Sequence, residues 1–386
     1  MRFPPTLAAF LVCLPIVAPS LFGQGNAEDD GLLRFDNAVS AFYDSNINGN
    51  SSEESDIELA YKPTLNFTRR SGLLGIDASV GGGFGWFLDN SEYDYQDFYS
   101  SFGIMYPNDA SIPYKLTLGG GYNSTSTLDR FVGGRVASDN ANLSARFRYN
   151  VNERWGFSLN SLWREITYDS ARYTDQTTWG AGFDFVYIYS EKLEIFAGYG
   201  YSETSAIDDY QDHTFRIKAE GELTPKLTGI LGLGYQIRES SAFGNTGDPY
   251  VNLDLAWAVN ERIEVAANSG IGYNTTSTGS SGTTTKLGMV AAMALSASLT
   301  GSLGVSYNES EYSDFGLDRS DEYLSYQAAL AWQLGASAAL TGSVTFEDAD
   351  STRDQLVYDR LRAGLNLRMS FSNWQCWGRK PCFVFP

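Results

Sequence analysis

The sequence predicts an all-β protein, a single closed antiparallel transmembrane β-barrel of about 18 strands, within a range of about 16 to 20. Three observations lead to this fold class. Apolar and polar residues alternate along many segments, which indicates strands with one apolar and one polar face. The chain holds 24 Tyr and 23 Phe but only 11 Pro, a composition that favours strands. Tight turns recur at intervals that each hold two long strands.

The first 27 residues have the layout of a secretory signal peptide. Arg2 supplies a positive charge, an apolar run extends from Leu7 to Ala18, and small residues follow up to Ala27. Because a membrane-spanning helix needs roughly 18 apolar residues, we expect export and cleavage rather than a helical anchor. The expected division is a signal peptide over 1–27, the barrel over 28–371 and a C-terminal tail over 372–386.

Strict alternation marks individual strands along the chain. It is clearest in "IELAYKPTLNFT" (57–68), "FRIKAEGEL" (215–223), "VNLDLAWAV" (251–259), "YLSYQAALAWQL" (323–334) and "YDRLRAGLNLRMSF" (358–371). Short turns are expected at 68–72, 106–113, 151–154, 189–192, 224–226, 259–262, 298–302 and 334–338, which are 34 to 42 residues apart. A soluble sandwich shows turns about every 8–12 residues. The longer rhythm is typical of the hairpins of an outer-membrane barrel.

The alternation also predicts which charged side chains point into the barrel. These lumen-lining candidates are Glu58, Lys62, Arg146, Arg148, Arg216, Lys218, Glu220, Glu222, Arg360, Arg362 and Arg368. One interpretation is an ordinary hydrated lining with balanced charge. The other is that Arg360, Arg362 and Arg368, together with Lys62, orient anionic or hydroxyl-rich solutes, because guanidinium groups bind both.

The negative charge of the chain, −19 overall, is concentrated in the longer connections, such as "DNSEYDYQD" (89–97) and "ETSAIDDYQD" (203–212). Two interpretations remain open. The acidic loops either keep an exposed surface soluble, or bind divalent cations that bridge to lipopolysaccharide phosphates, since hard cations prefer oxygen ligands. The acidic balance argues against nucleic acid as a partner.

Catalytic chemistry has little support in the sequence. The single histidine, His213, follows Asp212 near the end of an expected strand, and no Ser-His-Asp spacing or phosphate-binding loop is present. The three cysteines, Cys13, Cys376 and Cys382, lie in the signal peptide and the tail, so the body holds no cysteine metal site. We expect no enzyme activity, no cofactor and no metal.

The segment "FDNAVSAFYDSNI" (35–47) resembles the first strand of the β-barrel porins of the second type, and the "GYGY" hairpin (198–201) and last strand are similar to that group as well. The resemblance implies a channel in the outer membrane of a Gram-negative bacterium, and we expect either passive passage of small polar solutes or export of a glycan; some relatives are associated with exopolysaccharide export. It implies lipid and lipopolysaccharide, the barrel-assembly machinery and a periplasmic polysaccharide-export system as partners. The alternative is a structural or adhesive barrel whose acidic loops contact partners. All the outer connections are short, so nothing in the sequence predicts a narrowed pore.

The alternating strand that closes on Phe371 looks like the signal read by the barrel-assembly machinery. The remaining segment, "SNWQCWGRKPCFVFP" (372–386), lacks alternation. It is either an accidental extension of the chain or a periplasmic clasp closed by a Cys376–Cys382 disulfide. Both interpretations place the tail outside the barrel wall.

Overall fold

The computed structural model describes residues 32–70, 72–109, 111–242, 244–312 and 318–373. The predicted signal peptide and both tail cysteines lie outside these residues. Two short 3-10 helices are present, η1 (Ser91–Tyr93) and η2 (Asp354–Leu356). The strands are β1 (Leu32–Asp44), β2 (Asp56–Arg69), β3 (Gly75–Phe87), β4 (Tyr95–Tyr106), β5 (Tyr114–Asp129), β6 (Gly134–Asn150), β7 (Trp155–Tyr168), β8 (Gln176–Ser190), β9 (Leu193–Ser205), β10 (Asp209–Thr224), β11 (Leu227–Ser240), β12 (Gly244–Asn260), β13 (Ile263–Thr275), β14 (Ser281–Ala294), β15 (Leu299–Tyr312), β16 (Arg319–Gly335), β17 (Ala338–Ser351) and β18 (Tyr358–Asn373).

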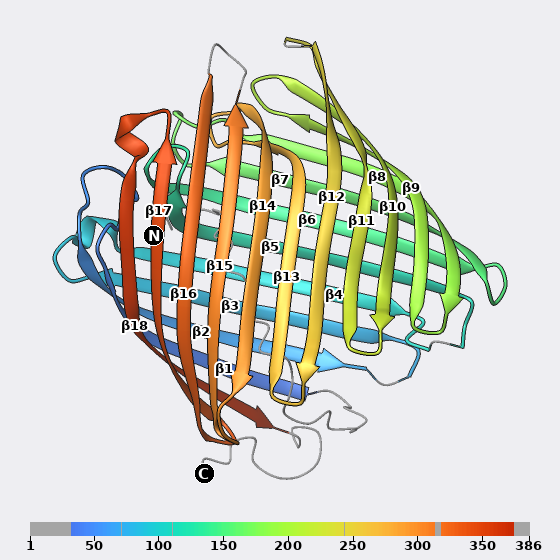
Figure 1. Ribbon diagram of the computed structural model, residues 1–386, viewed down its shortest axis with the longest axis horizontal. Helices are drawn as coiled ribbons and strands as arrows, with labels where there is room; N and C mark the ends of the chain where they lie inside the picture. Colours follow the sequence, from blue (N-terminus) through green and yellow to red (C-terminus); the bar gives the residue numbers. More distant parts are fainter. Residues whose placement is uncertain (1–31, 71, 110, 243, 313–317, 374–386) are drawn as a thin grey trace, which may run out of the picture.

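The strands form one closed sheet. Each strand pairs antiparallel with its neighbours in sequence, and β1 also pairs with β18, in register from Leu33 opposite Asn373 to Asp44 opposite Arg362. Closure leaves no sheet edge, which in lipid would expose unpaired backbone groups at high cost. The nearer and farther strands cross in Figure 1, as tilted strands of a barrel do. The predicted fold class is confirmed, with 18 strands in the described chain.

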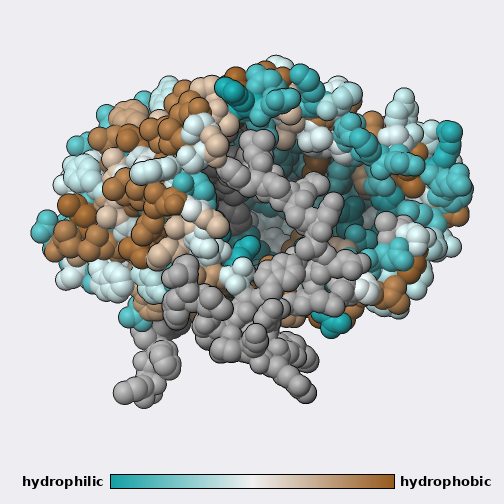
Figure 2. All heavy atoms as spheres, turned by 90° about the horizontal axis from the view of Figure 1, so that it is seen from below, coloured by the Kyte–Doolittle hydropathy of each residue, from teal (hydrophilic) through white to brown (hydrophobic). Residues whose placement is uncertain are grey.

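The distribution of side chains is the reverse of that in a soluble protein. Large apolar residues are exposed on the outside of the wall, with exposed fractions of 64% for Ile217 and 68% for Leu303. Buried positions are often charged, and Asp184 and Arg319 are each 3% exposed. Figure 2 shows apolar residues gathered on the outer wall and hydrophilic residues in the hollow between the walls. This arrangement fits a wall that faces lipid and encloses a polar lumen.

Every second connection, beginning with the one between β2 and β3, lies at the end of the barrel where Leu32 and Asn373 also lie. We call this the short-turn end and the opposite end the outer mouth. The turn expected at 298–302 lies instead at 295–298, between β14 and β15. No helix in the described residues is long and apolar enough to cross a membrane.

The last strand is longer than the sequence predicted. β18 continues past Phe371 to Asn373, because Arg34 and Leu33 of β1 offer pairing partners to Ser372 and Asn373. The first two residues assigned to the tail therefore belong to the wall. Residues 374–386 lie outside the described part of the chain.

Candidate functional site

The candidate site is the lumen wall together with the outer mouth. On the wall, Arg148 on β6 donates two hydrogen bonds to the carboxylate of Glu194 on β9, at 2.9 and 2.8 Å. Arg216 on β10 donates to Asp184 on β8 at 2.8 Å. β7 and β8 lie between β6 and β9 in the sheet, and β9 lies between β8 and β10, so both arginines reach over intervening strands along the inner face of the wall. These two predicted arginines therefore face the lumen, and the carboxylates of Glu194 and Asp184 neutralise their positive charges.

The other predicted residues of this wall have similar contacts. Lys218 lies 2.7 Å from Glu220, and Lys192 of the β8–β9 turn lies 2.6 Å from Glu222. Arg146 donates to the hydroxyl of Ser158 at 3.2 Å. The lumen charges of β6 to β10 thus form a network rather than a row of free cations.

Phe196 on β9 explains how three of these cations lie so close together. Its ring is only 1% exposed. The Lys218 ammonium lies 4.1 Å from its centroid, and the guanidinium carbons of Arg148 and Arg146 lie 5.8 and 5.9 Å away. A cation over an aromatic face is attracted by the ring quadrupole. The aromatic residue therefore holds the basic cluster against the wall.

The arginine cluster predicted on the last strand is brought together, but with carboxylates between its members. Arg360 donates to Asp44 at 2.9 Å, and Arg362 donates to Glu58 at 2.5 Å. Arg368 lies 3.8 Å from Asp36, an ion pair at the limit of contact. Sequence reasoning missed the β1 carboxylates Asp36 and Asp44, although they alternate with the apolar residues of their strand.

Lys62 completes this group on β2. It stands opposite Ala38 of β1, whose other neighbour is Arg368 of β18. The structure therefore places all four predicted cations on one part of the wall, together with a comparable number of carboxylates.

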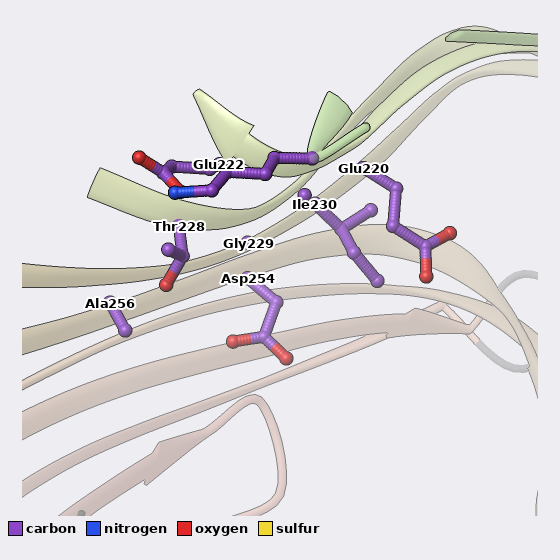
Figure 3. A pocket seen from close by; sticks show the side chains of 9 residues that line it. Glu220, Glu222, Thr228, Gly229, Ile230, Asp254 and Ala256 are labelled. Carbon is purple, nitrogen blue, oxygen red and sulfur yellow. The ribbon is translucent and has the colours of Figure 1, made fainter. Parts of the chain in front are cut away.

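A recess of about 590 Å³ opens near the short-turn end. Figure 3 shows the side chains of Glu220, Glu222 and Asp254 around it, with Thr228 and Ile230 between them. Among the described residues, no group of three or more His, Cys, Asp or Glu is arranged to hold a metal ion. The recess is a widening of the polar wall rather than an enclosed site.

The outer mouth is crossed by the β5–β6 tip, which we define as residues 128–135. β4, β3, β2, β1 and β18 separate β5 from β17 in the sheet. Even so, Arg130 forms an ion pair with Glu347 of β17. Arg319 at the start of β16 donates a hydrogen bond to the carbonyl oxygen of Phe131 at 2.9 Å. The tip therefore reaches the opposite wall of the barrel.

Aromatic contacts add to this docking. The Phe131 ring lies 4.9 Å from that of Tyr312 in an edge-on arrangement, and the Arg319 guanidinium lies 4.2 Å from the Phe131 centroid. The Tyr323 hydroxyl donates to the carbonyl oxygen of Arg130 at 3.3 Å. Arg319 itself is held by Asp321, and both side chains are 1% exposed. The arginine that receives the tip is thus itself buried in an ion pair with the wall.

The β1–β2 loop, residues 45–55, lies against the same tip. Asn50 donates from its amide to the carbonyl oxygen of Gly133 at 2.9 Å, and the Ser51 amide donates to Gln355 of the β17–β18 connection at 3.0 Å. Gly49 has a φ of +57°, and a Cβ there would meet Leu128 at 2.8 Å. Loop and tip therefore pack without a gap.

The β13–β14 loop, residues 276–280, folds inward from another side. The Thr174 amide donates to Ser277 at 2.8 Å, and the Tyr210 hydroxyl donates to Gly279 at 3.1 Å. Both donors belong to the wall and loops of β7 to β10. The expectation that nothing narrows the pore is therefore wrong at the outer mouth. Short connections suffice, because the β5–β6 tip and the β13–β14 loop each contact strands or loops that are not their neighbours in the sheet.

His213 and Asp212, which are adjacent in the sequence, do not pair with each other; His213 lies 3.9 Å from the carboxylate of Glu239. His213 accepts or donates a hydrogen bond with the Tyr199 hydroxyl at 2.7 Å, through Nδ1. Asp212 instead pairs with Arg238 at 2.6 Å. Successive residues of a strand point to opposite faces, so His213 and Asp212 cannot act on one substrate.

Comparison with known proteins places the fold in context. Residues 216–371 match the family described as "Putative beta-barrel porin 2". The structure of OccK2 (OpdF) from Pseudomonas aeruginosa is similar with a TM-score of 0.52 at 10% identity, covering 89% of this chain and 98% of that chain. OpdK from the same organism, solved with vanillate, gives 0.50 at 9% identity, with 88% and 98% covered.

No curated protein matches the chain significantly. At such low identity, the likeness to the solved structures concerns the fold. The family match confirms the predicted resemblance to the β-barrel porins over residues 216–371, which include the last strand; the first strand and the "GYGY" hairpin lie outside the match. With its closed sheet and apolar outer wall, the chain is a β-barrel of the outer-membrane type, and its residues 216–371 are similar to the β-barrel porins.

Proposed function

We propose that the protein is an outer-membrane channel for the passive passage of small polar solutes. The observation that carries this proposal is the closed 18-strand wall with charged side chains inside and exposed apolar side chains outside. A barrel of 16–18 strands encloses an aqueous channel unless it is plugged. Passage would be driven by the solute gradient and would need no cofactor.

The ion pairs of the lumen bear on how strongly the channel selects solutes by charge. Arg148, Arg216 and Arg362 each face a carboxylate at 2.9 Å or less. A wall of paired charges offers polar contacts to hydrated solutes without a strong field of one sign. We therefore propose weak selection by charge, and lipopolysaccharide as the neighbour of the acidic rim.

Reconstitution of the purified protein into a planar lipid bilayer tests the proposal. The expected result is stepwise conductance in potassium chloride, with swelling of proteoliposomes in glucose or sucrose. Heat-unfolded protein is the control for leakage caused by detergent. A folded barrel that gives neither conductance nor swelling would contradict channel function and favour a structural or adhesive role.

A further inference from the structure

The β5–β6 tip, residues 128–135, lies across the outer mouth of the barrel. Two consecutive residues at its end, Arg130 and Phe131, contact β15, β16 and β17. Arg130 pairs with Glu347, whose other oxygen accepts a hydrogen bond from Tyr358 at 2.7 Å. Phe131 lies between Tyr312 and Arg319. An anchor of two residues can hold this tip, because the loop between the strands is only residues 130–133.

The anchor is electrically balanced. Arg130 meets the carboxylate of Glu347, and Arg319 meets that of Asp321. These two ion pairs therefore add no net charge to the mouth. The side chains of Arg130 and Phe131 do, however, occupy space that would be open in an unobstructed barrel.

The backbone geometry of the tip supports a fixed crossing. Gly133 has a φ of +68°, and a Cβ there would meet Leu356 of η2 at 2.5 Å. The tip is thus pressed against the β17–β18 connection on one side and the β1–β2 loop on the other. Leu356 itself is 1% exposed.

We propose that the β5–β6 tip is the size filter of the channel, and that Arg130 and Phe131 are the residues that set its limit. This inference rests on the proposed channel function and names its solute class. In the docked state the mouth admits small hydrated solutes, such as ions and sugars of one or two units, and excludes a polymer. Selection by size at a constriction needs no change in the lumen wall.

The test compares Arg130→Ala and Phe131→Ala with the unaltered protein in planar bilayers and in swelling assays with glucose, sucrose and raffinose. Each change should raise the single-channel conductance about twofold or more and admit raffinose faster, because the constriction loses an anchor. Arg70→Ala is the matched control. It removes an arginine that pairs with Asp77 at 3.0 Å near the short-turn end, and should leave both quantities unchanged.

A charge exchange separates docking from the mere loss of a side chain. Arg130→Glu alone should open the mouth, and Arg130→Glu combined with Glu347→Arg should restore the lower conductance. Conductance and sugar size limit that stay unchanged in Arg130→Ala, Phe131→Ala and Arg130→Glu would overturn the proposal.

A cross-linking experiment tests the crossing without any conductance measurement. In a chain with Cys376→Ser and Cys382→Ser, the pair Phe131→Cys and Tyr312→Cys should be joined by a short bis-maleimide and change gel mobility. The pair Phe131→Cys and Ser158→Cys should not be joined. Joining of the first pair in a protein that never conducts would refute the channel function while keeping the crossing. Failure to join it in folded protein that keeps the conductance and the sugar size limit of the unaltered protein would refute the crossing itself.

Discussion

Asp56 at the start of β2 shows how one carboxylate can order a loop of the outer mouth. Its oxygens accept backbone N–H bonds from Leu88, Asp89 and Asn90, at 3.1, 3.2 and 2.8 Å, and a side-chain bond from Asn90 at 3.0 Å. Burial alone would raise the pKa of Asp56, but the hydrogen bond from the Ile57 amide, at 2.6 Å, and those from Asn90 and Asp89 outweigh it and lower the pKa from its ordinary value of 3.8. The ionised form is therefore the one that holds residues 88–94.

Replacing Asp56 by Ala should release residues 88–94, because several amide groups lose a charged acceptor. The measurement is hydrogen exchange of this segment in detergent. A lowered pKa stabilises the loop fully above pH 3.8, and this stabilisation is lost as the pH falls through the lowered value. Asp109→Ala, in the β4–β5 turn, is the control. Unchanged exchange in Asp56→Ala would contradict the role of the carboxylate.

Two arginines of β18 should differ in their effect on stability. The side chain of Arg360 is 13% exposed and its partner Asp44 is 4% exposed, whereas Arg368 is 62% exposed. Removing one member of a buried pair costs about 3–5 kcal/mol, since the other charge stays buried. An exposed pair contributes about 0–1 kcal/mol. Arg360→Ser should therefore lower the temperature at which the barrel unfolds on a gel far more than Arg368→Ser; equal shifts would contradict this reading of the two pairs.

The same strand provides the test of ion preference. Replacing Arg360, Arg362 and Arg368 together by Ser leaves the carboxylates of Asp44 and Glu58 without their arginines. The reversal potential in a potassium chloride gradient should then move towards cation preference. Arg70→Ser near the short-turn end serves as the control. An unchanged reversal potential would remove these arginines from the determinants of selectivity.

At the scale of the element, Gly364 allows β18 to approach β1 closely at the seam, which we define as the β1–β18 pairing that closes the barrel. A Cβ on Gly364 of β18 would meet the Ala41 carbonyl oxygen of β1 at 2.1 Å, whereas nothing lies within 4 Å of a Cβ on Gly272 of β13. Gly364→Ala should therefore impair closure and yield less heat-modifiable, membrane-inserted protein, while Gly272→Ala should insert normally. Equal insertion of the two variants would show that the seam has room to adjust.

Strands could be predicted from the sequence where the pattern that determines them lies within the strand itself. Alternation gave the faces of β2, β10 and β18, because a strand in lipid must separate apolar from polar side chains. The position of the β5–β6 tip could not be predicted. The sequence around Arg130 and Phe131 does not indicate that these residues contact Glu347 and Arg319, which lie about two hundred residues away. Pairing of Arg360 with Asp44 was hidden for the same reason, since it depends on the register across the seam.

At the scale of the whole molecule, the end of β18 determines where the barrel closes. β18 completes its pairing with β1 at Asn373, and the Phe371 side chain lies on the outer face with an exposed fraction of 37%. The strand thus ends with an aromatic residue two positions before its last pair. An alternating strand with this ending is the part of the chain that we expect the assembly machinery to bind.

A chain that ends at Asn373 should therefore still insert and conduct, because every pair of the seam is retained. A chain that ends at Phe371 loses only the pairs of Ser372 and Asn373 with Arg34 and Leu33, and it should insert with a modest loss of stability. A chain that ends at Leu367 also loses the assembly residue and should fail to insert. Heat-modifiability on gels and conductance in bilayers distinguish these outcomes. Loss of assembly on ending the chain at Asn373 would show that residues 374–386 carry the signal instead of Phe371.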